Sequence, residues 1–232
     1  YGLCFASGCA ATASIMHCLK SGDHVLVAED VYGGTYRLFD KIYSNLGLSF
    51  DFIDFQDHDL IKNKIKDNTK MLWIETPSNP MMMILDIKEI SAIAKENGLT
   101  SVVDNTFATP ILQRPLDLGA DLVLHSTTKY LGGHSDVVGG AIVTNDLSWH
   151  ERLAFVQNGV GAVPGPWDSF LTLRGTKTLA VLIARHCENA KKIVSYLSEH
   201  SRVNQIYYPG LDSHPGHAIA KSQMSDFGGM IS

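Results

Sequence analysis

The sequence has only four cysteines, and their spacing is not that of a metal site or a redox motif. Cys4, Cys9, Cys18 and Cys187 include no C-x-x-C pair. A chain of 232 residues is long enough to fold around a hydrophobic core without disulfide bonds. We therefore expect reduced thiols and a cytoplasmic protein.

Long apolar runs and an excess of basic residues are also missing. No stretch approaches the roughly 20 apolar residues that a membrane-spanning helix needs. The 19 lysines and arginines are scattered and outnumbered by 24 acidic residues, which gives a net charge of -5. Proteins that bind nucleic acids usually carry a basic face that neutralises phosphates. The composition therefore argues against both a membrane protein and a nucleic-acid-binding protein.

Two common signatures of binding sites are absent as well. Ala11 and Ala13 stand where a dinucleotide-binding G-x-G-x-x-G motif would require glycine, which disfavours a nucleotide-binding α/β module. His214-Pro-Gly-His217 is the only close histidine pair, and no cysteine or carboxylate cluster has zinc spacing. We expect no metal site, and we interpret the histidine pair as part of a solvated loop.

Short apolar runs rich in β-branched residues alternate with helix-length amphipathic stretches, which is typical of the α/β class. The near-continuous apolar runs favour a mostly parallel sheet with helices on both faces. Strands are predicted at Leu3–Ala6, His24–Ala28, Ser49–Ile53, Lys70–Ile74, Thr100–Val103, Asp121–His125 and Val138–Val143. Helices are predicted at Cys9–Lys20, Thr35–Leu46, His58–Lys66, Ile87–Asn97, Ser148–Asn158 and Lys177–His200.

The longest helical pattern, Lys177–His200, predicts a connection between two domains. Residues 1–200 form the large domain in this interpretation. A strand-like segment, Val203–Tyr208, follows and ends at Pro209-Gly210, and the chain stops at Gly228–Ser232 within a further apparent strand. Residues 201–232 are therefore expected to begin a smaller, truncated C-terminal α+β domain. Because the chain starts at Tyr1 without a methionine, we also expect its first segment to be missing.

Lys129 stands in an unusual place for a lysine. The apolar run Leu122–His125 ends in Ser126-Thr-Thr128-Lys129, which puts an amine beside hydroxyl groups at the end of a strand. This arrangement suits a lysine that forms a Schiff base next to a phosphate. The alternative is a surface lysine in a polar turn.

Two further segments place polar groups at strand ends. Ser7-Gly8-Cys9 follows the first strand and can present a capping hydroxyl and free amides to a phosphate, although a simple capped helix fits equally well. Asp104 ends another strand and could keep a heterocyclic nitrogen protonated, or it could cap the next turn. In open α/β sheets ligands bind beyond the carboxyl ends of the strands, so Ser7, Asp104 and Ser126 should lie close together.

Three residues in loops are candidates for ligand contacts. Tyr32, followed by two glycines, can present its ring to a planar ligand. Arg37 is a candidate anchor for an anion, and a solvated helix arginine is an equal alternative. Asn79 lies between two prolines that would aim its amide, but a rigid turn residue would look the same.

Taken together, these motifs resemble the pyridoxal-phosphate enzymes of cysteine and methionine metabolism, the transsulfuration family. The resemblance covers nearly the whole chain, and it implies the aspartate-aminotransferase-like fold of type I pyridoxal-phosphate enzymes. The matching motifs are Phe5-Ala-Ser-Gly, Val31-Tyr-Gly-Gly-Thr, Glu75-Thr-Pro-Ser-Asn-Pro, Val103-Asp-Asn-Thr-Phe, Ser126-Thr-Thr-Lys-Tyr, Gly132-Gly-His-Ser-Asp-Val-Val and Gly161-Ala-Val-Pro-Gly-Pro.

The resemblance implies a role for each candidate residue. Lys129 would bind the cofactor covalently, Asp104 would pair with its ring nitrogen, and Asn79 would meet its ring hydroxyl. Tyr32 would stack on the ring and exchange protons with the substrate, while Arg37 would face the substrate. The residues expected to hold the phosphate are Ser7, Gly8, Cys9, Ser126 and Thr128. Cys9 would contribute only its backbone amide, and a small packed residue describes it equally well.

Within the family, the chain is most similar to the cystathionine γ-lyases, through Tyr1-Gly-Leu-Cys-Phe-Ala-Ser-Gly and Gln157-Asn-Gly-Val-Gly-Ala-Val-Pro. That similarity implies γ-elimination of L-cystathionine to L-cysteine, 2-oxobutanoate and ammonia, a step of cysteine biosynthesis. Gly34 departs from methionine γ-lyases, which are expected to carry cysteine there. Cystathionine γ-synthase and cystathionine β-lyase remain alternatives. A non-catalytic paralogue is disfavoured because Lys129, Asp104 and Tyr32 are all present.

The resemblance also implies a homotetramer whose active sites are shared within dimers. Members of the family take a tyrosine and an arginine for the phosphate from the N-terminal segment of a neighbouring subunit. They take the arginine that binds the substrate carboxylate from the C-terminal domain. Both segments are expected to be missing here, so this chain should hold only part of the site.

Overall fold

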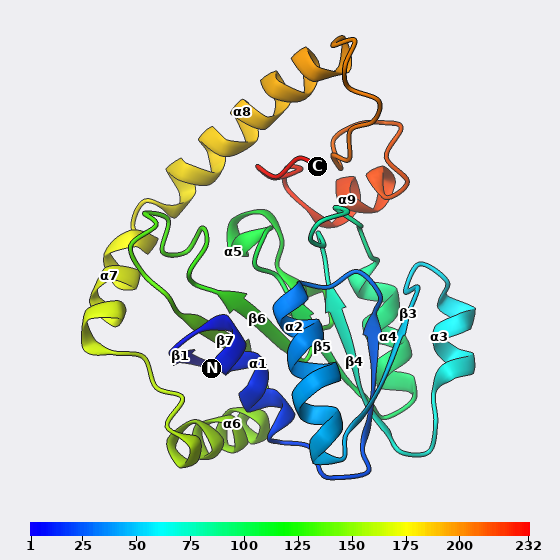
Figure 1. Cartoon of the computed structure of the whole chain (residues 1–232), viewed down its shortest axis with the longest axis vertical. Coiled ribbons are helices and arrows are strands. Elements are labelled where there is room, and N and C mark those ends of the chain that lie inside the picture. Colours follow the sequence, from blue (N-terminus) through cyan, green and yellow to red (C-terminus); the bar gives the residue numbers. More distant parts are fainter.

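The computed structural model describes all 232 residues and is centred on a seven-stranded sheet (Figure 1). The strand order is β1-β7-β6-β5-β4-β2-β3. The strands are β1 (Gly2–Phe5), β2 (His24–Ala28), β3 (Ser49–Ile53), β4 (Thr69–Glu75), β5 (Thr100–Asp104), β6 (Leu122–Ser126) and β7 (Gly140–Thr144). Strands β2 to β6 pair in parallel, while β7 is antiparallel to both β1 and β6. The seven strands predicted up to residue 143 and the mostly parallel sheet are confirmed.

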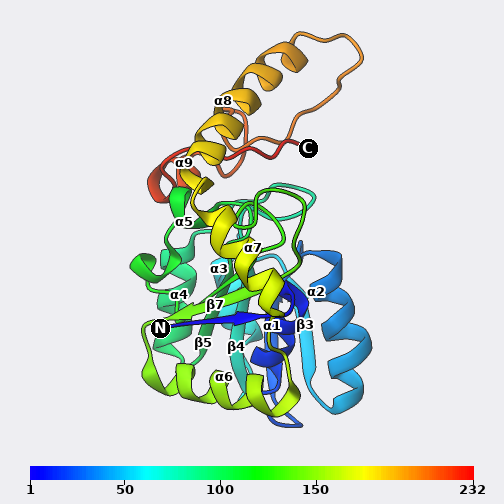
Figure 2. The ribbon, with the colours of Figure 1, turned by 90° about the vertical axis from the view of Figure 1, so that its left-hand side faces the viewer.

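Helices cover both faces of this sheet. Figure 2 shows α4 on one side and α1 and α2 on the other. The helices are α1 (Gly8–Met16), α2 (Gly33–Arg37), α3 (His58–Lys64), α4 (Ile87–Glu96), α5 (Thr109–Leu112), α6 (Leu147–Val160), α7 (Pro166–Thr176), α8 (Leu179–Ser198) and α9 (His217–Gln223). None of them is both long and apolar enough to cross a bilayer.

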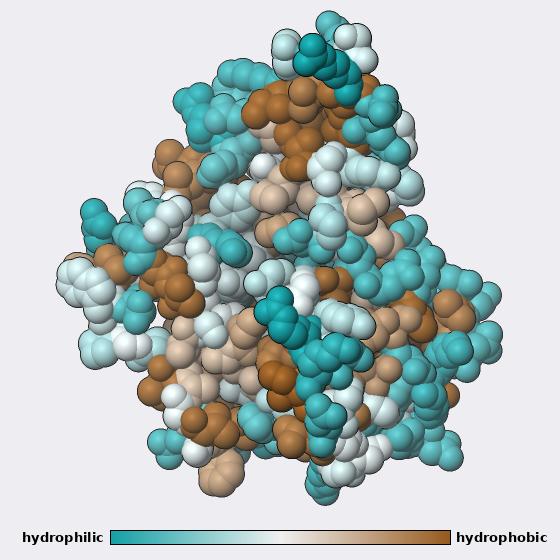
Figure 3. Space-filling model, viewed as in Figure 1, coloured by the Kyte–Doolittle hydropathy of each residue, from teal (hydrophilic) through white to brown (hydrophobic).

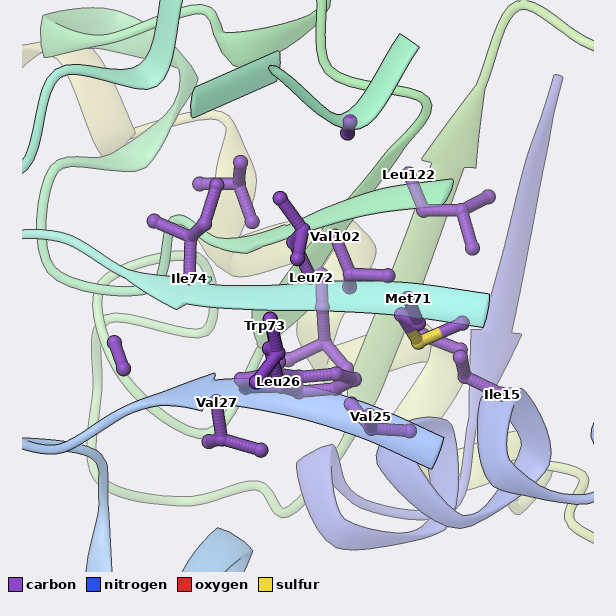
Figure 4. Packing of buried hydrophobic residues seen from close by; sticks show 14 of the residues in the cluster. Ile15, Val25, Leu26, Val27, Met71, Leu72, Trp73, Ile74, Val102 and Leu122 are labelled. Atoms are coloured by element: carbon purple, nitrogen blue, oxygen red, sulfur yellow. The ribbon is translucent and has the colours of Figure 1, made fainter. Parts of the chain in front are cut away.

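The main core lies around the neighbouring strands β5, β4 and β2. Every residue of β2 is buried, and so is every residue of β4 except Lys70. Figure 4 shows Leu26 of β2, Leu72 and Trp73 of β4 and Val102 of β5 within this cluster. Burial on both faces explains why the apolar runs that predicted these strands are nearly continuous.

Several helices differ from the prediction. The expected helix Thr35–Leu46 begins earlier, at Gly33, and changes after Arg37 into a π-helical turn and then a 3-10 turn. Helix α7 was not predicted, because Gly165-Pro166 resembles a turn and only Gly175 of the helix is buried. The short helices α5 and α9 were also missed.

The C-terminal segment forms neither of its two predicted strands. Val203–Tyr208 and Gly228–Ser232 share only one backbone pair, in which the amides of Tyr207 and Ser232 donate to each other's carbonyls at 2.7 and 3.1 Å. A β-ladder needs successive pairs of this kind, and Pro209 has no N–H to donate. Helix α8 extends away from the sheet (Figure 2), and a division of the chain at residue 200 stays a prediction.

Candidate active site

The carboxyl ends of neighbouring strands bring the predicted polar residues together. Glu75 at the end of β4 lies opposite Asp104 at the end of β5. A cavity of about 1220 Å³ opens at this edge of the sheet. Nine predicted site residues line it: Ser7, Gly8, Cys9, Tyr32, Asn79, Asp104, Ser126, Thr128 and Lys129. Arg37, in contrast, is exposed at the end of α2 and does not line the cavity.

The start of α1 packs against the end of β6. The Ser7 hydroxyl accepts a hydrogen bond from the Ala10 amide at 3.0 Å, which confirms the predicted cap. A Cβ atom added to Gly8 would lie 3.0 Å from Cβ of Ser126, so a larger residue would push the helix and strand apart. Because first-turn amides of a helix have no partner within the helix, this corner offers several donors to an anion.

Lys129 lies in the turn that follows β6. Its amide donates to the Ser126 carbonyl at 3.3 Å, and its carbonyl accepts from the Gly133 amide at 2.8 Å. The Lys129 side chain is exposed, lines the cavity and takes part in no ion pair of the structure. Its amine is therefore free to react with a ligand in the cavity.

Asp104 is a buried carboxylate with no basic partner. One of its oxygens accepts from the amide and the hydroxyl of Thr106, at 3.0 and 2.5 Å. Burial raises the pKa of Asp104 to about 6, and the Thr106 hydrogen bonds oppose this shift. The contact with the Thr106 amide also agrees with the turn-capping interpretation, although the next helix begins only at Thr109. A cationic nitrogen in the cavity would give Asp104 the charge partner that it lacks.

Thr106 was not singled out from the sequence, yet it connects two strands. Its hydroxyl donates to Asp104 and accepts from the Ser126 amide at 2.8 Å. The carboxylate at the end of β5 is thus tied to the hydroxyl-rich end of β6. The sequence signal was its place two residues after Asp104.

Glu75 is the second residue that sequence reasoning passed over. It is buried at the end of β4 and lines the cavity. Its carboxylate accepts a hydrogen bond from the Tyr32 amide at 2.8 Å. The backbone amide of Asn79 also favours the charged form of this carboxylate. Burial, and then the charge of Asp104, raise the pKa of Glu75 well above its usual range. The sequence placed Glu75 inside a family motif but gave it no role.

The position of Tyr32 explains Gly34. Tyr32 precedes α2 and is 47% exposed, with its ring lying against Gly34. A Cβ atom at Gly34 would come too close to that ring, so a side chain at this position would require the Tyr32 ring to shift. His125, beside Ser126, is buried, and its Nδ1 atom has no hydrogen-bond partner. Burial lowers the pKa of His125 to about 4.

Comparisons with known proteins agree on one family. A sequence model for the Cys/Met metabolism PLP-dependent enzymes matches residues 1–232. A protein from Coxiella burnetii named cystathionine beta-lyase is 54% identical over 234 residues, covering 100% of this chain and 60% of the relative. One from Herpetosiphon aurantiacus, named probable cystathionine gamma-synthase, is 53% identical over 232 residues, covering 100% of this chain and 73% of the relative.

A solved structure has the same fold as this chain. The cystathionine gamma-lyase of Lactobacillus plantarum, complexed with L-serine, superposes with a TM-score of 0.98 at 46% identity. The superposition covers 99% of this chain and 60% of that one. The present chain thus spans between 60% and 73% of the length of these three proteins.

Proposed function

Because this chain belongs to the Cys/Met metabolism PLP-dependent enzymes, we propose that its cavity performs the γ-elimination of L-cystathionine. The products would be L-cysteine, 2-oxobutanoate and ammonia. The observation that supports this proposal is the convergence of Lys129, Asp104 and Tyr32 on one cavity. An amine, a buried carboxylate and a phenol are the groups that this chemistry needs.

The residues of the cavity fit pyridoxal 5'-phosphate. The corner formed by Ser7, Gly8, Cys9, Ser126 and Thr128 offers hydroxyls and helix amides to the phosphate. This corner requires glycine at position 8, because a side chain there would come too close to Ser126. Asp104, buried without a cation, would pair with the protonated ring nitrogen, and Asn79 would meet the ring hydroxyl.

Each remaining group has a defined task in this proposal. The bound cofactor supplies an electron sink for negative charge at substrate carbons. Lys129 holds the cofactor and, once its amine is free, carries protons to and from the substrate. Tyr32, which lines the cavity, would protonate the departing sulfur through its phenol.

Product analysis of the purified full-length protein tests the reaction. Given L-cystathionine, it should release 2-oxobutanoate and cysteine, which mass spectrometry separates from pyruvate and homocysteine. Release of pyruvate and homocysteine would instead establish the β-lyase, the name carried by the relative from Coxiella burnetii. Synthesis of cystathionine from cysteine and an activated homoserine, without elimination, would establish the γ-synthase.

A cysteine in the proposed phosphate corner allows a direct test of cofactor binding. Cys9 is exposed and lines the cavity, while Cys4 is exposed but lies outside it. Iodoacetamide should label both thiols in the apoprotein, and pyridoxal phosphate should slow the labelling of Cys9 alone. At a cofactor concentration of ten times its Kd, the rate should fall roughly tenfold, because only the unoccupied protein reacts. Mass spectrometry of the two peptides gives the rates. Equal protection of Cys4, or none of Cys9, would place the cofactor elsewhere.

We also propose that the full-length protein is a cytoplasmic homotetramer with active sites shared within dimers. Apolar side chains lie exposed on α7, where Trp167 is 68%, Phe170 55% and Leu173 68% accessible. Figure 3 shows apolar surface over α7 at the left edge of the molecule. Contiguous apolar surface of this kind is common where proteins associate. This supports assembly with further copies of the chain.

A further inference from the structure

Two loops from adjacent strands carry residues of the proposed cofactor site. Tyr32 lies in the loop between β2 and α2, and Asn79 lies in the loop after β4. Strands β2 and β4 are neighbours in the sheet, so the loops leave the same edge side by side. Their relative position sets where the Tyr32 ring and the Asn79 amide stand.

Two carboxylates join these loops. Glu75 accepts a hydrogen bond from the backbone amide of Tyr32 at 2.8 Å, and the backbone amide of Asn79 favours its charged form. Asp30 accepts the Ser78 hydroxyl and the Met81 amide, the latter at 3.1 Å. Glu75 lines the cavity, whereas Asp30 does not. The connection made by Glu75 is therefore the one that lies next to the reacting groups.

Glu75 lies where burial destabilises a charged carboxylate. It is buried opposite Asp104 and has no basic partner. Two buried acids side by side destabilise a fold unless each forms other contacts. The hydrogen bond from the Tyr32 amide, together with the effect of the nearby Asn79 amide, offsets part of this destabilisation.

We propose that Glu75 is a positioning residue that fixes the Tyr32 backbone and the Asn79 loop beside Asp104, so that the Tyr32 phenol reaches the substrate. This inference rests on the proposed function, because it assigns the proton transfer to Tyr32. Glu75 itself touches neither cofactor nor substrate in this account. It acts through the residue whose amide it binds.

A double-mutant cycle in the full-length holoenzyme tests the proposal. Glu75→Gln keeps the shape but replaces the carboxylate by an amide oxygen, which is a weaker acceptor for the Tyr32 amide. It should lower kcat about 10- to 100-fold with a smaller change in KM, as a displacement of about 1 Å does. In a Tyr32→Phe background the same change should cost less than about threefold. The matched control is Glu29→Gln, because Glu29 is an exposed acid in the same loop as Tyr32. Its kcat should stay within about twofold of the parent.

The proposal would be overturned if Glu75→Gln lowered kcat by the same factor in the parent and in the Tyr32→Phe variant. It would also be overturned if Glu75→Gln changed kcat no more than Glu29→Gln does. Glu75→Asp, which retracts the carboxylate, should lower kcat to a similar extent as Glu75→Gln. This variant replaces Glu75→Gln in the cycle if the glutamine variant does not fold.

Hydrogen exchange in the apoprotein separates this proposal from the proposed function. Glu75→Gln should speed exchange of the Tyr32 amide at least about threefold, because its hydrogen bond weakens, while Glu29→Gln should not. If the parent protein turns over no sulfur amino acid, the proposed function fails. Unchanged Tyr32 exchange would contradict the Glu75 contact itself.

Discussion

Replacing Lys129 by alanine should lower turnover of sulfur amino acids by at least about 10⁴-fold, the upper range for loss of a general base. The same change should remove the visible absorption of the holoenzyme. Lys129 is the only lysine that lines the cavity, so no second amine can take over its covalent role. Steady-state kinetics and an absorption spectrum of the purified full-length variant give both results.

The fold should not change with this substitution. Lys129 is exposed and has no ion pair, so the thermal unfolding temperature of the apoprotein should match the parent. Lys177→Ala is the matched control, because Lys177 is exposed and outside the cavity. A Lys129→Ala protein that keeps its colour and turnover would rule out the proposed covalent role.

Asp104→Asn should have opposite effects on activity and on stability. Activity should fall on the order of 10²- to 10³-fold, as it does when one group that stabilises developing charge is removed. The apoprotein should become more stable at neutral pH, because asparagine fills the same space and can still accept from Thr106 without carrying a buried charge.

The pH dependence follows from the direction of the shift. Burial raises the pKa of Asp104 from 3.8 to about 6, so between these values the folded state binds more protons than the unfolded state. The stability that Asp104 contributes is therefore present below pH 3.8 and is lost as pH rises to about 6. The loss is at most about 3 kcal/mol, from roughly two pKa units at 1.36 kcal/mol each.

Urea unfolding of the parent and Asp104→Asn apoproteins at pH 4 and pH 7 tests this account. The free energy of unfolding of the variant, relative to the parent, should rise between the two pH values. Removing the Asp104 charge also removes one cause of the raised pKa of Glu75, which adds to the same trend. A relative stability that is flat or falls with pH would mean that Asp104 has a partner or an exposure that the structure does not give it.

The strands and most of the candidate site could be predicted from the sequence because both depend on local patterns. A fully buried run such as His24–Ala28 fits only a strand that lies between two other strands and is covered on both faces. Residues directly after such runs must then gather at one edge, which is why Asp104 and Ser126 were found without any coordinates. The capping role of Ser7 followed equally from its place before a small-residue helix.

Contacts between distant segments could not be predicted in this way. The hydrogen bond from the Tyr32 amide to Glu75 joins residues 43 apart, and it exists only because β2 pairs with β4. The bond from the Ser126 amide to Thr106 similarly depends on the pairing of β5 with β6. The hydrophobic pattern of the sequence predicts at which edge of the sheet a residue lies. Its hydrogen-bond partner at that edge depends on the order of the strands.

The wrong predictions have similar causes. Helix α7 exposes Trp167, Phe170 and Leu173 to solvent, so it lacks the buried stripe from which a helix is predicted. Val203–Tyr208 has the composition of a strand, but a strand requires a partner, and here only Tyr207 finds one, in Ser232.

Reductive trapping locates the bond between protein and cofactor, and it therefore tests whether Lys129 carries the cofactor. The full-length holoenzyme would be treated with borohydride, digested and analysed by mass spectrometry, with Lys129→Ala as the control. We expect a single pyridoxyl group on the peptide that contains Ser126–Tyr130, attached to Lys129. A label on another lysine, or no label on a protein that still turns over cystathionine, would contradict the account.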